Sequence, residues 1–238
     1  MKRTRPFIEK IDARTTRKDR SRQAILGAYV QLVNETRRQP TALQIAERAG
    51  CSLRLIFQHF ADLPSLTVAA AFVAYTEGRA RADAAKLDGD RQTRISTHLE
   101  RRARNCEAWL PLWRVGFGLK DQSTELLQLG LLVRKATLDR LSEMYAPELT
   151  SLAAVDRRRL LIALEAILDY ESWGRLRDEH GLSVEQAVQH WVAIVDRMLP
   201  PTPATMRTAP RRLADAGESA MPTIHDPLSS GGDVPLAF

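Results

Sequence analysis

The sequence predicts an all-α protein. Apolar residues recur at helical spacing along most of the chain, as at Ile25, Ala28, Tyr29 and Leu32. No segment shows the alternation rich in β-branched residues that is typical of strands. Gly, Pro and capping Ser, Thr or Asp residues separate the periodic segments. These observations predict a chain of helices joined by short connections.

Composition limits the location and the chemistry of the chain. Its 238 residues, 44% of them hydrophobic, suffice for a buried core. The two cysteines, Cys51 and Cys106, form no CxxC pair, so we expect neither a disulfide scaffold nor a cysteine-built zinc site. No apolar run approaches the roughly 20 residues that cross a bilayer, and no apolar segment follows the basic N-terminus. We therefore expect a cytoplasmic protein with no membrane partner.

Positive charge is concentrated near the N-terminus. Residues 1–60 carry 13 Lys and Arg against 5 Asp and Glu, which leaves 22 against 24 in the rest of the chain. A basic head on a nearly neutral body is expected of a nucleic-acid-binding module, because each phosphate contact needs a positive partner. A solvated basic terminus with no partner is an equally good interpretation of charge alone.

The N-terminal part divides into an arm and short helices. Residues 1–18 lack apolar periodicity and predict a flexible basic arm, and a first helix follows at about 19–35. Thr41 and Gln44 form a capping-box pattern that opens a second helix, which ends at Gly50.

The next helices have their own start signals. Ser52 can cap a third helix over about 53–59. Asp62, with Pro64 in the first turn, predicts a fourth helix that extends to about Lys86. Further helices are expected at about 91–105, from near Pro111, and at 124–144, 155–180 and 183–199. Residues 200–238 are rich in Pro, Ser, Gly and Asp, and we expect a disordered tail because they cannot bury enough surface to offset the entropy of ordering.

The strongest motif is QIAERAGCSLRLIFQHF, at residues 44–60. Two short helices that meet steeply need a small residue at the contact and a turn residue that tolerates positive φ, and Ala46 and Gly50 supply these. Apolar residues to lock the pair are present at Ile45, Ala49, Ile56, Phe57 and Phe60. The pattern predicts a helix-turn-helix whose second helix can enter the major groove of DNA. A helical hairpin with no role in DNA binding remains the alternative.

These residues resemble a known family. Residues 45–52, followed by 56–60 and Leu66, are similar to the N-terminal signature of TetR-type transcriptional regulators. The similarity covers about residues 20–70, and the rest of the chain matches in organisation only. The resemblance implies a helix-turn-helix DNA-binding domain at 19–65 and a helical ligand-binding and dimerisation domain at 66–199. It implies a homodimer on a palindromic operator in double-stranded DNA, acting as a repressor that responds to an unknown small-molecule effector.

The resemblance also implies which residues contact DNA. Thr41, Ser52, Phe57 and His59 match positions that contact phosphates or brace the reading helix, while Leu53, Arg54 and Gln58 match positions that meet base edges. Phe57 replaces a usual Tyr and Leu63 a usual Lys. The basic residues before and at the start of the first helix are expected to supply phosphate contacts instead: Arg14, Arg17, Lys18 and Arg20. His59 is equally well interpreted as a structural residue, and for Phe57 packing is the better expectation.

The dimer interface is expected in the last two long helices. Residues 160–170 are apolar almost all the way round, so such a helix must be covered on two sides. The resemblance implies that this helix and the one at 183–199 pair with their copies in a second chain. The expected interface residues are Leu164, Leu168, Val188, Trp191 and Val195. A monomeric core is the alternative.

Aromatic residues mark the expected effector cavity, for which the resemblance implies a mostly apolar small molecule between the fourth and seventh helices. The candidate residues are Phe72, Tyr75, Trp109, Trp113 and Phe117. Ordinary core packing is the alternative for each of them.

An enzyme is not expected. The sequence contains no P-loop, G-x-G-x-x-G, H-E-x-x-H or G-x-S-x-G motif, and its five histidines are scattered without the spacing of metal ligands. We therefore expect no catalytic residues, no cofactor and no metal. A helical interaction module, or a small-molecule-binding protein without DNA specificity, is the remaining alternative.

Overall fold

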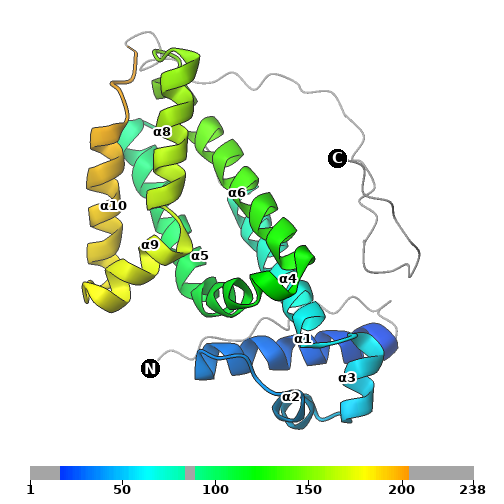
Figure 1. Ribbon diagram of the computed structural model, residues 1–238. Coiled ribbons are helices and arrows are strands. Elements are labelled where there is room, and N and C mark those ends of the chain that lie inside the picture. Colours follow the sequence, from blue (N-terminus) through cyan, green and yellow to red (C-terminus); the bar gives the residue numbers. More distant parts are fainter. Residues whose placement is uncertain (1–16, 84–88, 204–238) are drawn as a thin grey trace. The chain divides into compact units, whose positions relative to one another are not determined.

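The computed structural model describes residues 17–83 and 89–203, and every regular element in these ranges is a helix, as predicted (Figure 1). The α-helices are α1 (Arg17–Thr36), α2 (Ala42–Ala49), α3 (Leu53–His59), α4 (Leu63–Asp83), α5 (Arg91–Gly118), α6 (Thr124–Met144), α7 (Ala146–Leu149), α8 (Ala154–Ile167), α9 (Tyr170–Gly174) and α10 (Val184–Met198). A 3-10 turn, η1 (Lys120–Gln122), precedes α6, and a π-helical turn, η2 (Arg175–Glu179), follows α9.

Local signals in the sequence set the ends of α2 and α3 where they are predicted. The Thr41 side chain accepts from the backbone N–H of Gln44, whose own side chain accepts from the Thr41 N–H, which completes the capping box. Gly50 ends α2 at φ 64°, in the left-handed region that favours glycine. Ser52 caps α3 by accepting from the N–H of Leu55 at 3.2 Å. The ends of α2 and α3 are therefore set by capping groups within a few residues of each end.

The N-terminal helix is longer than predicted. Arg17 and Lys18, which we assign to the arm from the sequence, form the first turn of α1. The expected apolar face is buried, with Ile25 and Tyr29 fully enclosed. The expectations of a flexible arm over residues 1–16 and of a disordered tail over 204–238 lie outside the described residues.

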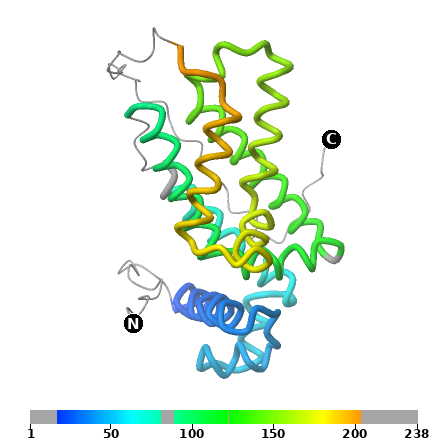
Figure 2. Tube along the Cα trace, turned by 90° about the vertical axis from the view of Figure 1, so that its left-hand side faces the viewer, coloured from blue at the N-terminus to red at the C-terminus, as the bar shows by residue number. Residues whose placement is uncertain are grey.

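Helix α5 is the central helix of the larger unit, and it packs against α1, α4, α6, α9 and α10. The side of this unit that carries α10 faces the viewer in Figure 2. The prediction of two helices separated near Pro111 is wrong, because α5 runs unbroken through Pro111 over 28 residues. A proline removes only one backbone hydrogen bond from a helix. Burial of Trp109, Leu110 and Leu112 on both sides of it offsets that loss.

The prediction of one helix over 155–180 is also wrong. Helix α8 ends at Ile167, and Asp169 starts α9 by accepting from the N–H of Ser172 at 2.6 Å. This break turns the chain so that Trp173 reaches the core, where its ring lies 4.7 Å from that of Trp191 in α10. Leu164, Leu168 and Tyr170 of this apolar segment are therefore covered by the same chain, whereas Ile162 is exposed.

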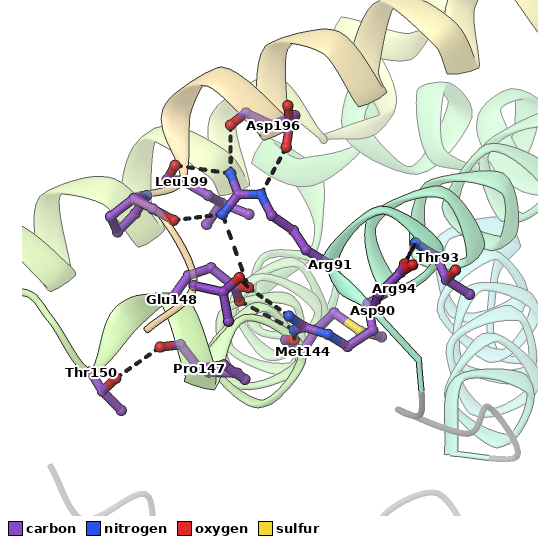
Figure 3. A network of polar contacts seen from close by, with 12 residues as sticks. Asp90, Arg91, Thr93, Arg94, Met144, Pro147, Glu148, Thr150, Asp196 and Leu199 are labelled. Carbon is purple, nitrogen blue, oxygen red and sulfur yellow. Dashed lines mark hydrogen bonds and ion pairs between the residues drawn. The ribbon is translucent and has the colours of Figure 1, made fainter. Parts of the chain in front are cut away.

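A buried polar network connects the start of α5 with α7 and the end of α10 (Figure 3). Both carboxylate oxygens of Glu148, which is fully buried, accept from the guanidinium of Arg94, at 2.5 and 3.2 Å. Arg91 donates to Asp196 and to the carbonyls of Leu199 and Pro200.

The same network orders the first residues after α10. The hydroxyl of Thr202 donates to the Glu148 carboxylate. Residues 200–203, which we assign to the tail from the sequence, are therefore held against the helical unit by polar contacts rather than by apolar burial.

Candidate nucleic-acid interface and ligand cavity

Helix α3 presents a mixed face that no part of the described chain covers. Arg54 and Gln58 are exposed, and Leu53 and Phe57 are 41% and 51% exposed. These four residues occupy positions i, i+1, i+4 and i+5, so they lie on one side of the helix. The expectation that Phe57 packs into the core is wrong, because Ile56 and Phe60 provide the buried contacts instead. An exposed stripe of an arginine, an amide and two apolar side chains offers both hydrogen bonds and methyl contacts to base edges.

His59 connects α3 to α1. Its Nε2 lies 2.7 Å from the Ser21 hydroxyl, and Arg22 donates to the His59 carbonyl at 3.3 Å. Burial, with further contributions from the positive charges of Arg22 and Lys18, lowers the pKa of His59 below its usual range, so the ring is neutral at pH 7. These contacts support the structural interpretation of His59: it fixes the angle between α3 and α1.

The other candidate DNA contacts are exposed. Arg17, Lys18 and Arg20 lie in the first turn of α1, with side chains open to solvent. The hydroxyls of Thr41 and Ser52 are exposed as well, although each accepts a hydrogen bond as a helix cap. All of these groups are accessible to phosphate oxygens, which cationic side chains and hydroxyls at helix starts commonly bind.

A contact that no sequence pattern predicts joins the helix-turn-helix region to the larger unit. The Tyr29 hydroxyl in α1 and the Thr67 hydroxyl in α4 are 2.7 Å apart, and both side chains are fully buried. Thr67 donates to the Leu63 carbonyl, so Tyr29 is the donor in the pair. Burial raises the pKa of Tyr29 to about 12, which keeps this donor protonated. No local sequence pattern signals such a pair, because its members are 38 residues apart.

The larger unit contains a cavity of about 810 Å³, lined by α4, α5 and α6 and by Tyr170 of α9. Tyr75, Trp109 and Trp113 line it, as the sequence analysis proposes. Phe72 and Phe117 do not. Phe117 is instead largely exposed beneath the ammonium group of Lys120, 4.0 Å from the ring centroid. The volume matches that of small-molecule sites, which usually span about 300–1,000 Å³.

Polar residues also line the cavity, and the sequence does not predict them. Arg102 lies with its guanidinium carbon 4.9 Å from the centroid of the Tyr170 ring. The Tyr170 hydroxyl accepts from the side-chain amide of Asn105 at 2.8 Å. His98 is hydrogen bonded to the Tyr145 hydroxyl at 2.8 Å. Helical spacing from Trp109 would have placed Arg102 and Asn105 on the same face of α5, so the signal was present at positions i−7 and i−4.

Four of the five residues expected at a dimer interface are buried within the single chain and cannot contact a second copy. Leu164, Leu168, Trp191 and Val195 are each at most 1% exposed within a single chain, and they form part of its own core. Only Val188 keeps partial exposure. The sequence shows that these side chains are apolar but cannot show whether the same chain covers them. The apolar residues of α8 that remain open are Val155 and Ile162, at 60% and 51% exposure.

Two negative findings hold for the residues that the structure describes. No single helix is long and apolar enough to cross a membrane, and only α3 taken together with Leu63–Ala80 of α4, across a bend of 64°, has sufficient length and apolar composition. Within residues 17–83 and 89–203, no three His, Cys, Asp or Glu side chains gather where they could hold a metal ion.

Comparison with known proteins assigns the fold. No known family model matches the chain, and no curated sequence does. Solved structures do match. A transcriptional regulator from Rhodococcus sp. Rha1 has a TM-score of 0.61 at 14% identity, over 77% of this chain and all of that one. A protein from Rhodococcus sp., described as a TetR-family transcriptional regulator, has a TM-score of 0.57 at 19% identity, over 75% of this chain and 98% of that one.

A third match has a title that names a ligand. The multidrug binding protein EbrR, solved with imidazole, has a TM-score of 0.51 at 18% identity, over 77% of this chain and 97% of that one. At these identities the likeness is one of fold. The protein is therefore an all-α helix-turn-helix protein. More particularly, it has the fold of the TetR-family transcriptional regulators, as the motif at residues 44–60 predicts.

Proposed function

We propose that the protein is a sequence-specific DNA-binding transcriptional regulator and that α3 is the helix that reads the bases. The observation that carries the proposal is the exposed face of α3, where Arg54 and Gln58 are accessible next to Leu53 and Phe57. Arginine pairs with guanine and glutamine with adenine through two hydrogen bonds each, which gives this face the means to discriminate bases. Arg17, Lys18 and Arg20 add sequence-independent affinity through phosphates.

We further propose that two copies act together on a palindromic operator, because proteins that read DNA through a single helix-turn-helix commonly bind paired half-sites as dimers. The contact is assigned to the exposed face of α8, where Val155 and Ile162 are seven residues apart and lie on one side of the helix. This assignment replaces the buried residues expected from the sequence.

The cavity supports a ligand-responsive mode of action, and among the two regulatory directions we propose repression that a ligand relieves. A ligand between α4 and α5 would act on DNA binding through the buried pair of Tyr29 and Thr67, which connects α4 to α1. This requires that the helix-turn-helix regions of the two copies can lie at two different separations, and that the ligand binds the protein more tightly at one separation than at the other.

Selection of bound sequences from a random duplex pool tests the function. The wild-type protein is expected to enrich a palindromic consensus. Arg54→Ala is expected to lose preference at one position in each half-site. Arg197→Ala removes an equally exposed arginine from α10 and is the matched control, expected to give the wild-type consensus. A pool with no consensus after repeated selection would contradict the proposal.

The dimer contact has its own test. Ile162→Glu is expected to give a monomer with weakened operator binding, because a charge placed in an apolar contact loses hydration without gaining a partner. Leu131→Glu on α6 makes the same change at a residue of similar exposure, 58%, and is expected to remain dimeric. Sedimentation velocity at micromolar concentration measures both, and a wild-type monomer would rule out the dimer.

A small-molecule-binding protein without DNA specificity is the second candidate, and the cavity is the observation that favours it. The two candidates differ in the selection experiment: this one expects ligand binding and no consensus sequence.

A further inference from the structure

The chemistry of the cavity is unusual for a site expected to take a mostly apolar molecule, and it begins with Arg102. This side chain lines the cavity, and its Nε donates to the carbonyl of Leu168 at 2.8 Å. None of the ion pairs within the described ranges includes Arg102. The carboxylates of Asp169 and Glu165 act on Arg102 only from beyond ion-pair distance, so this partly buried guanidinium has lost hydration without gaining an ion pair.

The remaining charges of the cavity wall do not neutralise Arg102. Five arginines line the cavity against two acidic residues. Of the acidic residues, Asp139 is paired with Lys135 at 2.7 Å and Glu143 lies 3.6 Å from Arg140, and both carboxylates are exposed. Burial, then the positive charges of Arg102 and Arg140, lowers the pKa of His98 to about 3. Cationic side chains therefore outnumber acidic ones in the wall of the cavity.

The other walls are flat and aromatic. Trp113 is stacked on Tyr170 with ring centroids 5.0 Å apart and an interplanar angle of 21°, and Trp109 also lines the cavity. Next to them, the side-chain oxygen of Asn105 is buried and has no hydrogen-bond partner among the described residues. An aromatic ring would fit against the indoles, and a hydroxyl or N–H group on it would satisfy that oxygen.

We propose that the cavity binds an organic carboxylate with a flat aromatic body, the carboxylate on Arg102 and the ring against Trp109 and Trp113. The partly buried guanidinium of Arg102 matches one negative charge, and its planar fork matches the two oxygens of a carboxylate. The inference rests on the proposed function only in making this ligand the effector. It replaces the mostly apolar effector expected from the sequence.

Isothermal titration of the full-length protein with two probes tests the ligand class. The probes are 2-naphthoate and 2-naphthamide, which have the same ring system and nearly the same shape but differ in charge. The acid is expected to bind at least about tenfold more tightly than the amide, since a buried charge-assisted pair is worth more than a neutral hydrogen bond. Equal affinities, or no binding of either probe at millimolar concentration, overturns the proposal.

Substitution of Arg102 assigns the charge. Arg102→Gln is expected to weaken naphthoate binding by about tenfold or more and to leave naphthamide binding unchanged. Arg102→Lys keeps the charge and is expected to retain part of the preference for the acid. Arg197→Gln, at an exposed site on α10, removes the same charge and is expected to bind both probes as the wild type does. An unchanged preference for the acid in folded Arg102→Gln protein contradicts the assignment.

Two further readouts keep the outcomes separate. If Arg102→Gln does not fold, Arg140→Gln at the cavity wall takes its place and is expected to reduce naphthoate affinity by a smaller factor. DNA binding is measured independently with and without naphthoate. Binding of the acid with no effect on operator affinity supports the ligand class and counts against the regulatory role. A protein that binds a specific operator but does not prefer the acid supports the proposed DNA-binding function and contradicts the ligand class.

Discussion

The buried carboxylate of Glu148 gives the sharpest stability prediction, the effect of Glu148→Ala. The wild-type carboxylate is fully buried and accepts twice from Arg94, which is itself 8% exposed (Figure 3). Removing it leaves a guanidinium buried without its charge partner, which costs roughly 3–5 kcal/mol. For a domain of this size each kcal/mol lowers the melting temperature by about 2–4 °C, so we expect a fall of roughly 6–20 °C.

Chemical denaturation of three variants measures this effect. Glu148→Ala is compared with Asp139→Ala, which removes a carboxylate from an exposed pair with Lys135 and should cost less than about 0.5 kcal/mol. The double variant Arg94→Met, Glu148→Leu removes both charges and should recover most of the loss, because neither group is then left buried alone. A loss below about 1 kcal/mol in Glu148→Ala, or a double variant no more stable than Glu148→Ala, would refute the reasoning.

The same pair predicts a pH dependence. Burial acts to raise the pKa of Glu148, but hydrogen bonds from Arg94 and Thr202 outweigh it, and the pKa is lowered below its usual value. A carboxyl whose pKa is lower in the folded state stabilises the protein above its unfolded-state pKa, near 4.5, and loses this contribution as the pH falls through the folded value. The stability gap between wild type and Glu148→Ala should therefore be constant near neutral pH and shrink in acid. Urea titrations from pH 7 to pH 3 measure it, and a gap that widens in acid would be inconsistent with the pair.

Three further predictions concern other parts of the chain. Arg54→Ala should cost about 1–3 kcal/mol of affinity per half-site and relax the base preference. Lys18→Ala should weaken binding to operator and scrambled duplex alike and reduce the slope of log affinity against log salt concentration by about one unit. Titrations at several salt concentrations separate the two variants, and identical effects would show that α3 does not read the bases. Tyr29→Phe should lower the free energy of unfolding by about 1 kcal/mol and weaken the effect of ligand on DNA affinity, and unchanged ligand coupling would show that the pair with Thr67 does not transmit it. Cys106, whose pKa burial raises to about 11, should react with a thiol reagent only on unfolding, and the half-buried Cys51 should react first; rapid labelling of both thiols in the native protein would contradict the burial of Cys106.

The sequence predicts helices α2 and α3 well because their boundaries depend on near neighbours. A hydroxyl at Thr41 needs only Gln44, three residues away, and the positive φ at Gly50 needs only the absence of a side chain. The exposed arginine and amide on α3 follow from helical spacing once its start at Leu53 is known. The exposure of Phe57 does not follow, because Ile56 and Phe60 are equally apolar and only the packing of neighbouring helices decides which of the three is covered.

The larger unit is less predictable because distant contacts decide its features. Pro111 signals a helix end locally, yet the burial around it keeps α5 continuous. Asp169 is a local start signal, but the apolar run before it conceals the break. The excess of cationic side chains in the cavity wall requires Arg102 of α5 and Arg140 of α6 to face one space, and no single-helix pattern shows this.

The continuity of α5 through Pro111 has a mechanical consequence. Since proline has no N–H to donate, the helix lacks one of the hydrogen bonds that resist bending. Helix α5 should therefore bend more easily at Pro111 than elsewhere. Arg102 lies on one side of this point. On the other lies Gly116, where an added Cβ would be 3.8 Å from the Thr67 methyl group and so within reach of the pair that Thr67 forms with Tyr29. A ligand that bent α5 at Pro111 would therefore shift Gly116 relative to Thr67 and, through Tyr29, change the position of α1.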